Sequence, residues 1–333
     1  MTRDKISQAV SEAMIPADTA LVLFGSLARD EYTQGSDCDW SLLVDGLANS
    51  DHHTASFNVE AEIRRAEIPE PGPTDLFGSL AFSHELVHQI GGDEDINRNT
   101  TRRILMLLES TSISTSGRLV RDRVVRQLIK RYLEQEFDVQ SPEGKRRYPR
   151  FLLNDIVRYW RTVAVDYARK VRDRQSEGWA IRNIKLRMSR KLTFVSGMLA
   201  CFDCVLHPRD IDAASPSPDE AQMGWLSVQE QLLENIEYTP LEMLAAAVDR
   251  YSATDETKRN LACKLLDPYD KFIGLMNDKS ARDELKNLDR DGDSNDIFQQ
   301  GRQLGHDFQQ GLLELFFETD SALTKATQEY GVF

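Results

Sequence analysis

The chain has few cysteines and no long apolar run. Its 333 residues include only four cysteines: Cys38, Cys201, Cys204 and Cys263. Four cysteines scattered over this length do not make a disulfide framework. No apolar stretch approaches the roughly 20 residues that a transmembrane helix needs, and the N-terminal segment has charges of both signs where a signal peptide would have an apolar core. These absences argue against a disulfide-rich secreted domain and a membrane protein, so we expect a cytoplasmic location.

Cys201 and Cys204 form the pattern Cys-x-x-Cys. A zinc or redox centre of this type usually needs a second ligand pair or a characteristic neighbourhood, and the sequence offers neither. We therefore expect two half-buried cysteines on a helix.

The chain is also poor in basic residues, but unevenly so. Its net charge is −13, yet residues 145–191 contain 15 lysines and arginines against four acids. This segment therefore carries +11 and the rest of the chain −24. A basic segment in an acidic protein predicts a local anionic ligand rather than a long polyanion.

Strand and helix patterns alternate in the first part of the chain. Short apolar runs predict strands at 20–24, 39–44 and 76–83, and helical patterns lie at 6–14 and 52–67. After about residue 115 nearly every pattern is helical, with candidates at 119–137, 151–174 and 181–199. Thr239, Pro240 and Glu242 form a capping box that predicts a further helix start. Ser294 or Asn295 is expected to cap another helix, because the acidic loop before it lacks the spacing of a calcium loop.

The segment LFGSLARDEYTQGSDCDWSLLV carries the strongest functional pattern. A strand leads into Gly25 and Ser26, and a turn-rich stretch leads to Asp37 and Asp39 at the start of the next strand. Residues i and i+2 of a strand point to one face, so the two carboxylates converge and require cations, for which Mg²⁺ is suited. Gly25 permits close approach of a phosphate, and Ser26 can donate its hydroxyl. These parts suit attack on the α-phosphate of a nucleoside triphosphate.

Gly-Ser, ten residues and then Asp-x-Asp resembles the motif of the DNA polymerase β-type nucleotidyltransferase superfamily. The phrase FGSLAR…GSDCDWSLLV is especially similar to the minimal and aminoglycoside-type nucleotidyltransferases. The resemblance covers residues 18–46 firmly and the rest by architecture. It implies an α+β fold, with a small mixed-sheet catalytic domain over residues 1–115 followed by an all-helical domain over residues 116–333.

The resemblance also implies roles for individual residues. Asp37 and Asp39 would bind Mg²⁺ or Mn²⁺, together with a third carboxylate on the next strand that often acts as general base. Asp75 is the first choice for this acid and Glu85 the second. The remaining candidates would contact the nucleotide: Gly25, Ser26, Arg29, Ser36, and Lys185 and Arg190 of the helical domain.

The expected activity is transfer of a nucleoside monophosphate from an NTP, with ATP favoured, to a hydroxyl acceptor with release of pyrophosphate. The acceptor is a protein side chain, a small molecule, an RNA 3′ end or a second nucleotide, and the sequence does not choose among them. The alternative is a catalytically silent antitoxin or regulatory binding protein with the same fold. Neither a membrane partner nor an oligomeric state is indicated.

Two further patterns offer other interpretations. His84, Glu85 and His88 match HExxH, with Glu109 as a conceivable third zinc ligand, but Gly91 and Gly92 would end such a helix early. We expect two histidines near a strand-to-helix junction, and a zinc hydrolase is the distant third hypothesis. Arg102 and Arg103, near the start of a helix, would face either an anion or solvent.

Overall fold

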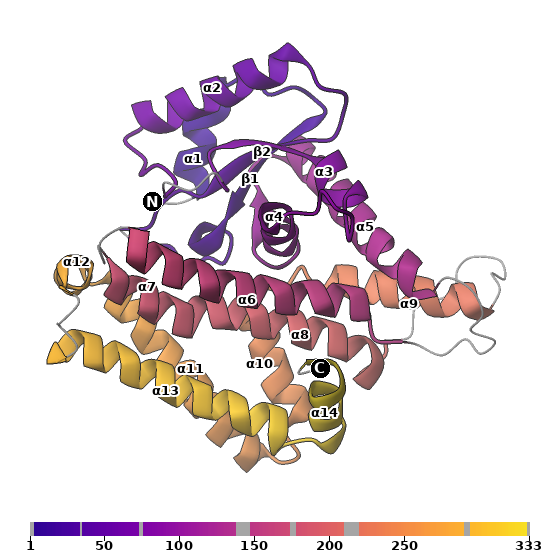
Figure 1. Ribbon diagram of the computed structural model, residues 1–333, viewed down its shortest axis with the longest axis vertical. Helices are drawn as coiled ribbons and strands as arrows, with labels where there is room; N and C mark the ends of the chain where they lie inside the picture. The colour runs from indigo at the N-terminus through magenta and orange to yellow at the C-terminus, as the bar shows by residue number, and fades with distance from the viewer. Residues whose placement is uncertain are drawn as a thin grey trace. The chain divides into compact units, whose positions relative to one another are not determined.

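The computed structural model describes residues 3–33, 35–72, 76–137, 147–173, 178–209, 220–289 and 294–331. The chain divides into two compact units, Met1–Ser141 and Pro142–Phe333 (Figure 1). The first combines a four-stranded sheet with helices, and the described part of the second contains helices alone. The expected α+β class, a small mixed sheet followed by a helical region, is confirmed.

The sheet of the first unit has the strand order β3-β2-β1-β4. Its strands are β1 (Thr19–Phe24), β2 (Trp40–Val44), β3 (Ser79–Phe82) and β4 (Ser110–Ser112). β1 pairs antiparallel with both β2 and β4, whereas β2 and β3 run parallel. The sequence did not predict β4, because three polar residues carry no apolar alternation.

Helices cover both faces of the two central strands, whose residues are all buried. On one face, Leu21 and Leu23 of β1 join a core with α1 (Arg3–Ala9) and α2 (Ser50–Arg65). On the other, α5 (Thr115–Phe137) lies against β1. Burial on both faces explains why β1 is a continuous apolar run rather than an alternating one.

The boundary between the units differs from the expected division after residue 115. It falls after α5, because that helix packs against β1, β4 and α3 (Ser83–His88) of the first unit. A helical pattern shows that a helix has an apolar face but not which core receives it.

Arg103 connects two helices of the first unit. It lies on α4 (Asn97–Leu108) and is fully buried. Its guanidinium donates to both carboxylate oxygens of Asp95, at 2.8 Å each, and to the hydroxyl of Tyr132 on α5 at 2.9 Å. Arg103 therefore faces neither an anionic ligand nor solvent, contrary to both expectations, because its charge is neutralised inside the fold.

The described part of the second unit is made up mainly of α-helices, with two π-helical segments among them. In chain order these are α6 (Arg150–Asp173), α7 (Trp179–Lys185), the π segment η3 (Leu186–Arg190), α8 (Lys191–Leu206), α9 (Glu220–Asn235), α10 (Pro240–Tyr251), α11 (Asp255–Asn277), α12 (Lys279–Asn287), α13 (Asp296–Phe317), α14 (Ser321–Ala326) and the π segment η5 (Thr327–Gly331).

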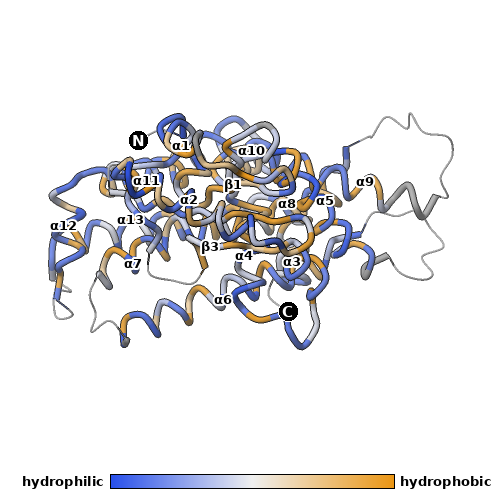
Figure 2. The backbone as a smooth tube through the Cα atoms, turned by 90° about the horizontal axis from the view of Figure 1, so that it is seen from above, coloured by the Kyte–Doolittle hydropathy of each residue, from blue (hydrophilic) through white to orange (hydrophobic). Residues whose placement is uncertain are grey.

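Helix α8 forms part of the core of this unit. It is apolar around most of its circumference, and α6, α9 and α10 pack against it. In contrast, α6 alternates between apolar and polar positions along its length, as its orange and blue stretches in Figure 2 show. A helix that is apolar around its whole circumference is typically buried, whereas an amphipathic helix has one apolar face that packs on the core. Helix α8 is of the first kind and α6 of the second.

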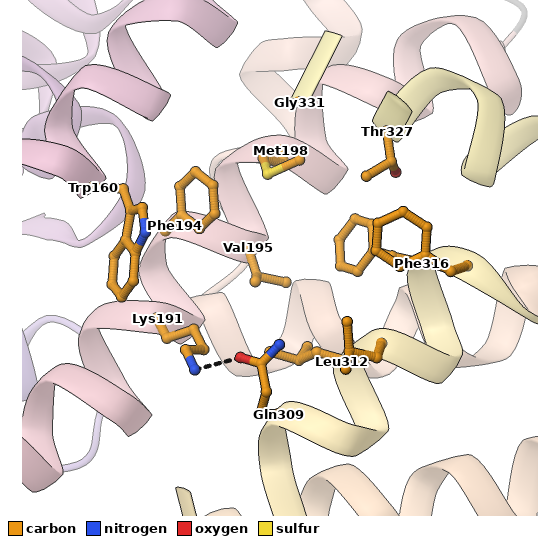
Figure 3. Close-up of a pocket in the computed structure, with 12 residues that line it drawn as sticks. Trp160, Lys191, Phe194, Val195, Met198, Gln309, Leu312, Phe316, Thr327 and Gly331 are labelled. Atoms are coloured by element: carbon orange, nitrogen blue, oxygen red, sulfur yellow. Dashed lines mark hydrogen bonds between the residues drawn. The ribbon is translucent and has the colours of Figure 1, made fainter. Parts of the chain in front are cut away.

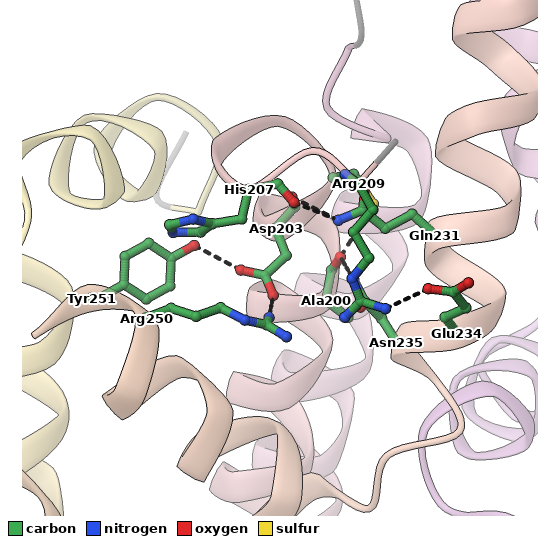
Figure 4. Close-up of polar contacts among 10 residues, drawn as sticks. Ala200, Asp203, His207, Arg209, Gln231, Glu234, Asn235, Arg250 and Tyr251 are labelled. Carbon is green, nitrogen blue, oxygen red and sulfur yellow. Dashed lines mark hydrogen bonds and ion pairs between the residues drawn. The ribbon is translucent and has the colours of Figure 1, made fainter. Parts of the chain in front are cut away.

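A polar network centred on Asp203 ties α8 to its neighbours (Figure 4). Asp203 is buried, accepts a hydrogen bond of 2.8 Å from the Tyr251 hydroxyl and pairs with Arg250, both on α10. From α9, the Asn235 amide donates to the Ala200 carbonyl at 3.0 Å. These contacts satisfy the buried carboxylate and fix the packing of three helices.

The two helix-cap predictions in this unit are confirmed, whereas the predicted half burial of two cysteines is wrong. Thr239 and Glu242 form the reciprocal hydrogen bonds of a capping box at α10, and the Asn295 side chain caps α13. Cys201 and Cys204 lie on α8, where they are fully rather than half buried.

Candidate active site

Gly25 and Asp39 come together because β1 and β2 are antiparallel. The end of β1 lies beside the start of β2, and the Phe24 amide donates to the Asp39 carbonyl at 2.9 Å. Gly25 follows with φ +65°, a left-handed conformation that glycine adopts without strain. A Cβ atom at this position would stand 3.2 Å from Oδ2 of Asp39. The backbone of Gly25 therefore directly borders the carboxylate.

Cys38 separates the two candidate metal ligands and points into the core. It is fully buried, and its amide donates to the Pro69 carbonyl at 2.9 Å. By the alternation of extended backbone, Asp37 and Asp39 point away from the core, and Asp37 is exposed while Asp39 is partly buried. That the two carboxylates share a face stays a prediction.

The electrostatic effect of these carboxylates is visible on the thiol between them. Burial, and then the negative charges of Asp39 and Asp37, raise the pKa of Cys38 to about 12. Cys38 is consequently a neutral thiol at physiological pH. Two neighbouring carboxylates in this position provide the oxygen ligands and the negative potential that a hard divalent cation prefers.

The segment after α2 also borders this site, which the sequence analysis missed. Pro69 holds the Cys38 amide, and a Cβ atom at Gly72 would lie 3.9 Å from Oδ2 of Asp37. Pro69, Pro71 and Gly72 are recognisable in sequence only as residues that end a helix. The contacts of Pro69 with Cys38 and of Gly72 with Asp37 depend on tertiary folding.

The two serines of the motif differ in their surroundings. Ser26 is partly exposed in a single 3₁₀ turn after β1, and its hydroxyl makes no hydrogen bond to any described residue. Ser36 is buried, and its hydroxyl interacts with the amide and hydroxyl of Thr33 at 3.1 and 3.0 Å. Ser26 thus has a donor to offer, whereas Ser36 stabilises the turn before Asp37.

Arg29 is held by two carboxylates. Its side chain, which is 6% exposed, pairs with Glu31 at 2.7 Å and with Glu109 at 2.5 Å. These two contacts join the turn after β1 to the end of α4. The contact of Arg29 with a nucleotide stays a prediction.

The third carboxylate remains a prediction. Asp75, the first choice, lies outside the described residues. Glu85 lies on α3, beyond the far end of β3, and lines a cleft of about 430 Å³ with Arg98 and Arg102. Over the described ranges, no three Asp, Glu, His or Cys side chains come close enough to hold a metal ion together. Glu85 is therefore not grouped with Asp37 and Asp39.

The HExxH residues occupy a short helix. His84, Glu85 and His88 belong to α3, which has six residues, and Gly91 follows with φ +73°. Glu109, the conceivable third zinc ligand, is buried and paired with Arg29. The histidines thus lie near a strand-to-helix junction, as the alternative interpretation expected.

Lys185 and Arg190 belong to the second unit, at the end of α7 and in the π segment that follows. Both are partly buried. Their contact with a nucleotide bound at Gly25 remains a prediction.

Comparison with known proteins supports the interpretation of the motif. Residues 3–70 match the model of the nucleotidyltransferase domain family, a range that contains Gly25, Ser26, Asp37 and Asp39. No curated protein and no solved structure matches the chain. The chain thus carries a nucleotidyltransferase domain at its N-terminal end. This domain is consistent with the polymerase β-type superfamily that the motif resembles.

No helix in the described part of the chain is both long and apolar enough to cross a membrane.

Proposed function

We propose that this protein transfers a nucleoside monophosphate from an NTP, with ATP favoured, to a hydroxyl acceptor and releases pyrophosphate. The observation that carries the proposal is the placement of Gly25 directly against the Asp39 carboxylate, with Asp37 exposed beside it. Backbone without a side chain thus lies next to one of the two candidate metal ligands.

Asp37 and Asp39 would hold Mg²⁺ or Mn²⁺, because both side chains point away from the core and carboxylate oxygens are the ligands that these cations prefer. When bound, the metal would neutralise charge on the triphosphate and polarise the α-phosphate. With Cys38 buried between them, the two carboxylates would lie on one side of the chain.

Gly25 and Ser26 would bind the triphosphate. The glycine leaves room for a phosphate oxygen near its backbone, and the Ser26 hydroxyl is available to donate a hydrogen bond. Lys185 and Arg190 would contact the β- and γ-phosphates, since they lie in the segment where the positive charge of the chain is concentrated.

Asp75 would complete the metal site and accept the proton of the acceptor hydroxyl. It precedes β3 in the sequence as Asp37 and Asp39 precede β2. Because β2 and β3 are parallel, their starting ends share one edge of the sheet. Glu85 follows the opposite end of β3, which favours Asp75 for this role.

The test is incubation of the protein with each of the four NTPs labelled at the α-phosphate, with Mg²⁺, Mn²⁺ or a chelator. Protein, RNA, nucleotide and small-molecule fractions are then analysed for label. We expect metal-dependent transfer to one fraction, strongest with ATP. Binding of NTP without transfer to any fraction would contradict catalysis and favour a regulatory binding protein.

A further inference from the structure

The second unit contains a pocket of about 270 Å³, close to the lower end of the range of roughly 300–1,000 Å³ for small-molecule sites. Figure 3 shows its walls, which come from α6, α8, α13 and the π segment Thr327–Gly331. The lining is apolar apart from a few groups, and its main side chains are Trp160, Phe194, Val195, Met198, Leu312 and Phe316.

The apolar walls continue to the molecular surface. Trp160 and Phe194 stack with ring centroids 5.4 Å apart and an interplanar angle of 20°. Leu313 and Phe317 also line the pocket and keep 38% and 41% of their surface exposed. Large apolar side chains that border an apolar pocket and remain exposed are characteristic of a binding site.

One cation, Lys191, lies in this apolar lining. Its ammonium donates to the side-chain oxygen of Gln309, a neutral partner, at 2.5 Å. No described carboxylate lies within ion-pair distance of Lys191. Burial, together with the nearby charge of Arg187, lowers the pKa of Lys191 to about 8. Lys191 is partly buried, and a cation withdrawn from water is normally paired with an anion, so its neutral partner Gln309 leaves its charge uncompensated within the described residues.

Of the π-helical segments described in the second unit, one lines this pocket and another ends directly before a lining residue. Leu186–Arg190 ends directly before Lys191, and Thr327–Gly331 contributes both of its end residues to the lining. π-Helical turns make up well under 1% of residues in proteins and frequently occur at functional sites. The backbone around the pocket is thus irregular on two sides.

We propose that this pocket binds a small amphipathic carboxylate, whose apolar chain or ring lies among Trp160, Phe194 and Phe316. Its carboxylate would pair with Lys191 and accept a hydrogen bond from the Gln309 amide. The lining accounts for both parts of this ligand. The apolar walls disfavour a polar chain or ring, and the Lys191 ammonium favours an anionic head group. The site belongs to the second unit alone and does not depend on the nucleotidyltransferase proposal.

The test uses octanoate as the probe, with 1-octanol and octylammonium as matched neutral and cationic probes, measured by titration calorimetry at pH 7. We expect octanoate to bind most tightly. Lys191→Met should weaken octanoate binding about 10- to 100-fold, as expected for loss of a charge-assisted hydrogen bond. It should leave 1-octanol binding unchanged. Lys191→Arg should retain octanoate binding, and the exposed control Lys325→Met should behave as the wild type.

A second measurement on the wild-type fold guards against misfolding of the variants. Reductive ¹³C-methylation gives each lysine an NMR signal. The signal that is missing from the spectrum of Lys191→Met is that of Lys191. Octanoate should shift this signal and raise the pKa that it reports, whereas 1-octanol should not raise it. Equal binding of octanoate and 1-octanol, a Lys191 signal unmoved by octanoate, or no binding at millimolar octanoate would each overturn the proposal.

Discussion

At the scale of single residues, Asp37 and Asp39 are the centre of the proposed chemistry. Asp37→Asn or Asp39→Asn should lower nucleotidyl transfer by about 10²–10³-fold or more, because a metal ligand contributes several kcal/mol of charge stabilisation. Stability should hold or rise slightly, since one of two neighbouring negative charges is removed. The measurements are transfer of α-labelled nucleotide and thermal unfolding.

The control for these variants is Asp93→Asn, an exposed aspartate in the same unit. It should keep both activity and stability. Wild-type transfer rates in Asp37→Asn or Asp39→Asn would show that the carboxylate pair is not the metal site.

Gly25 offers a second test at this scale. Gly25→Ala should destabilise the fold by about 1–2 kcal/mol, the cost of a left-handed L-residue. It should also lower transfer, because the added methyl group would lie 3.2 Å from the Asp39 carboxylate.

Gly91→Ala is a matched control for that variant. Gly91 has φ +73°, but a Cβ atom there would meet nothing within 4 Å. Gly91→Ala should lose as much stability in chemical denaturation as Gly25→Ala, but it should keep full transfer activity. If both alanines reduce transfer equally, the effect of Gly25→Ala comes from backbone strain and not from crowding at Asp39.

At the scale of secondary-structure elements, the two ends of β3 distinguish the candidates for the third carboxylate. Asp75→Asn should slow the transfer step by about 10²–10⁴-fold, the usual contribution of a general base. Nucleotide binding should be reduced less, because Asp37 and Asp39 would still hold the metal. Single-turnover kinetics and equilibrium nucleotide binding separate the two effects.

Glu85→Gln is the matched substitution at the other end of β3 and should leave transfer intact. If instead Glu85 is essential and Asp75 dispensable, the base comes from the cleft that contains Arg98 and Arg102. If neither acid matters while Asp37 does, another group must activate the acceptor.

The Asp203 network tests how the helices of the second unit are held together. Asp203→Ala should destabilise the protein by about 3–5 kcal/mol, because Arg250 loses its buried partner. The exposed pair of Asp249 and Lys258 provides the comparison, and Asp249→Ala should cost about 1 kcal/mol or less. Urea denaturation measures both, and similar losses for the two variants would contradict a structural role for the network.

At the scale of the whole molecule, the proposed roles of Lys185 and Arg190 can be tested separately from those of Asp37 and Asp39. Lys185→Ala and Arg190→Ala should weaken binding of ATP more than binding of AMP, since AMP lacks the β- and γ-phosphates that these two side chains would bind. Equilibrium binding of both nucleotides is the measurement. Equal weakening of ATP binding and AMP binding would assign these two residues a role unrelated to the triphosphate.

The sequence by itself determined the features that depend on near neighbours. Backbone periodicity accounts for the strands β1 and β2 and for the placement of Asp37 and Asp39 around Cys38. Short-range hydrogen bonds account for the cap at Thr239. For the same reason, the Gly25–Ser26 motif was enough to indicate the nucleotidyltransferase domain.

Only the tertiary structure decided which distant residues meet. Arg29 pairs with Glu109, 80 residues away, a partner that no local pattern indicates. Lys191 meets Gln309 across 118 residues, and helix α5 joins the first unit because β1 receives its face. Local patterns specify the chemical character of a surface, but the partner that buries or neutralises it is selected by packing over the whole chain.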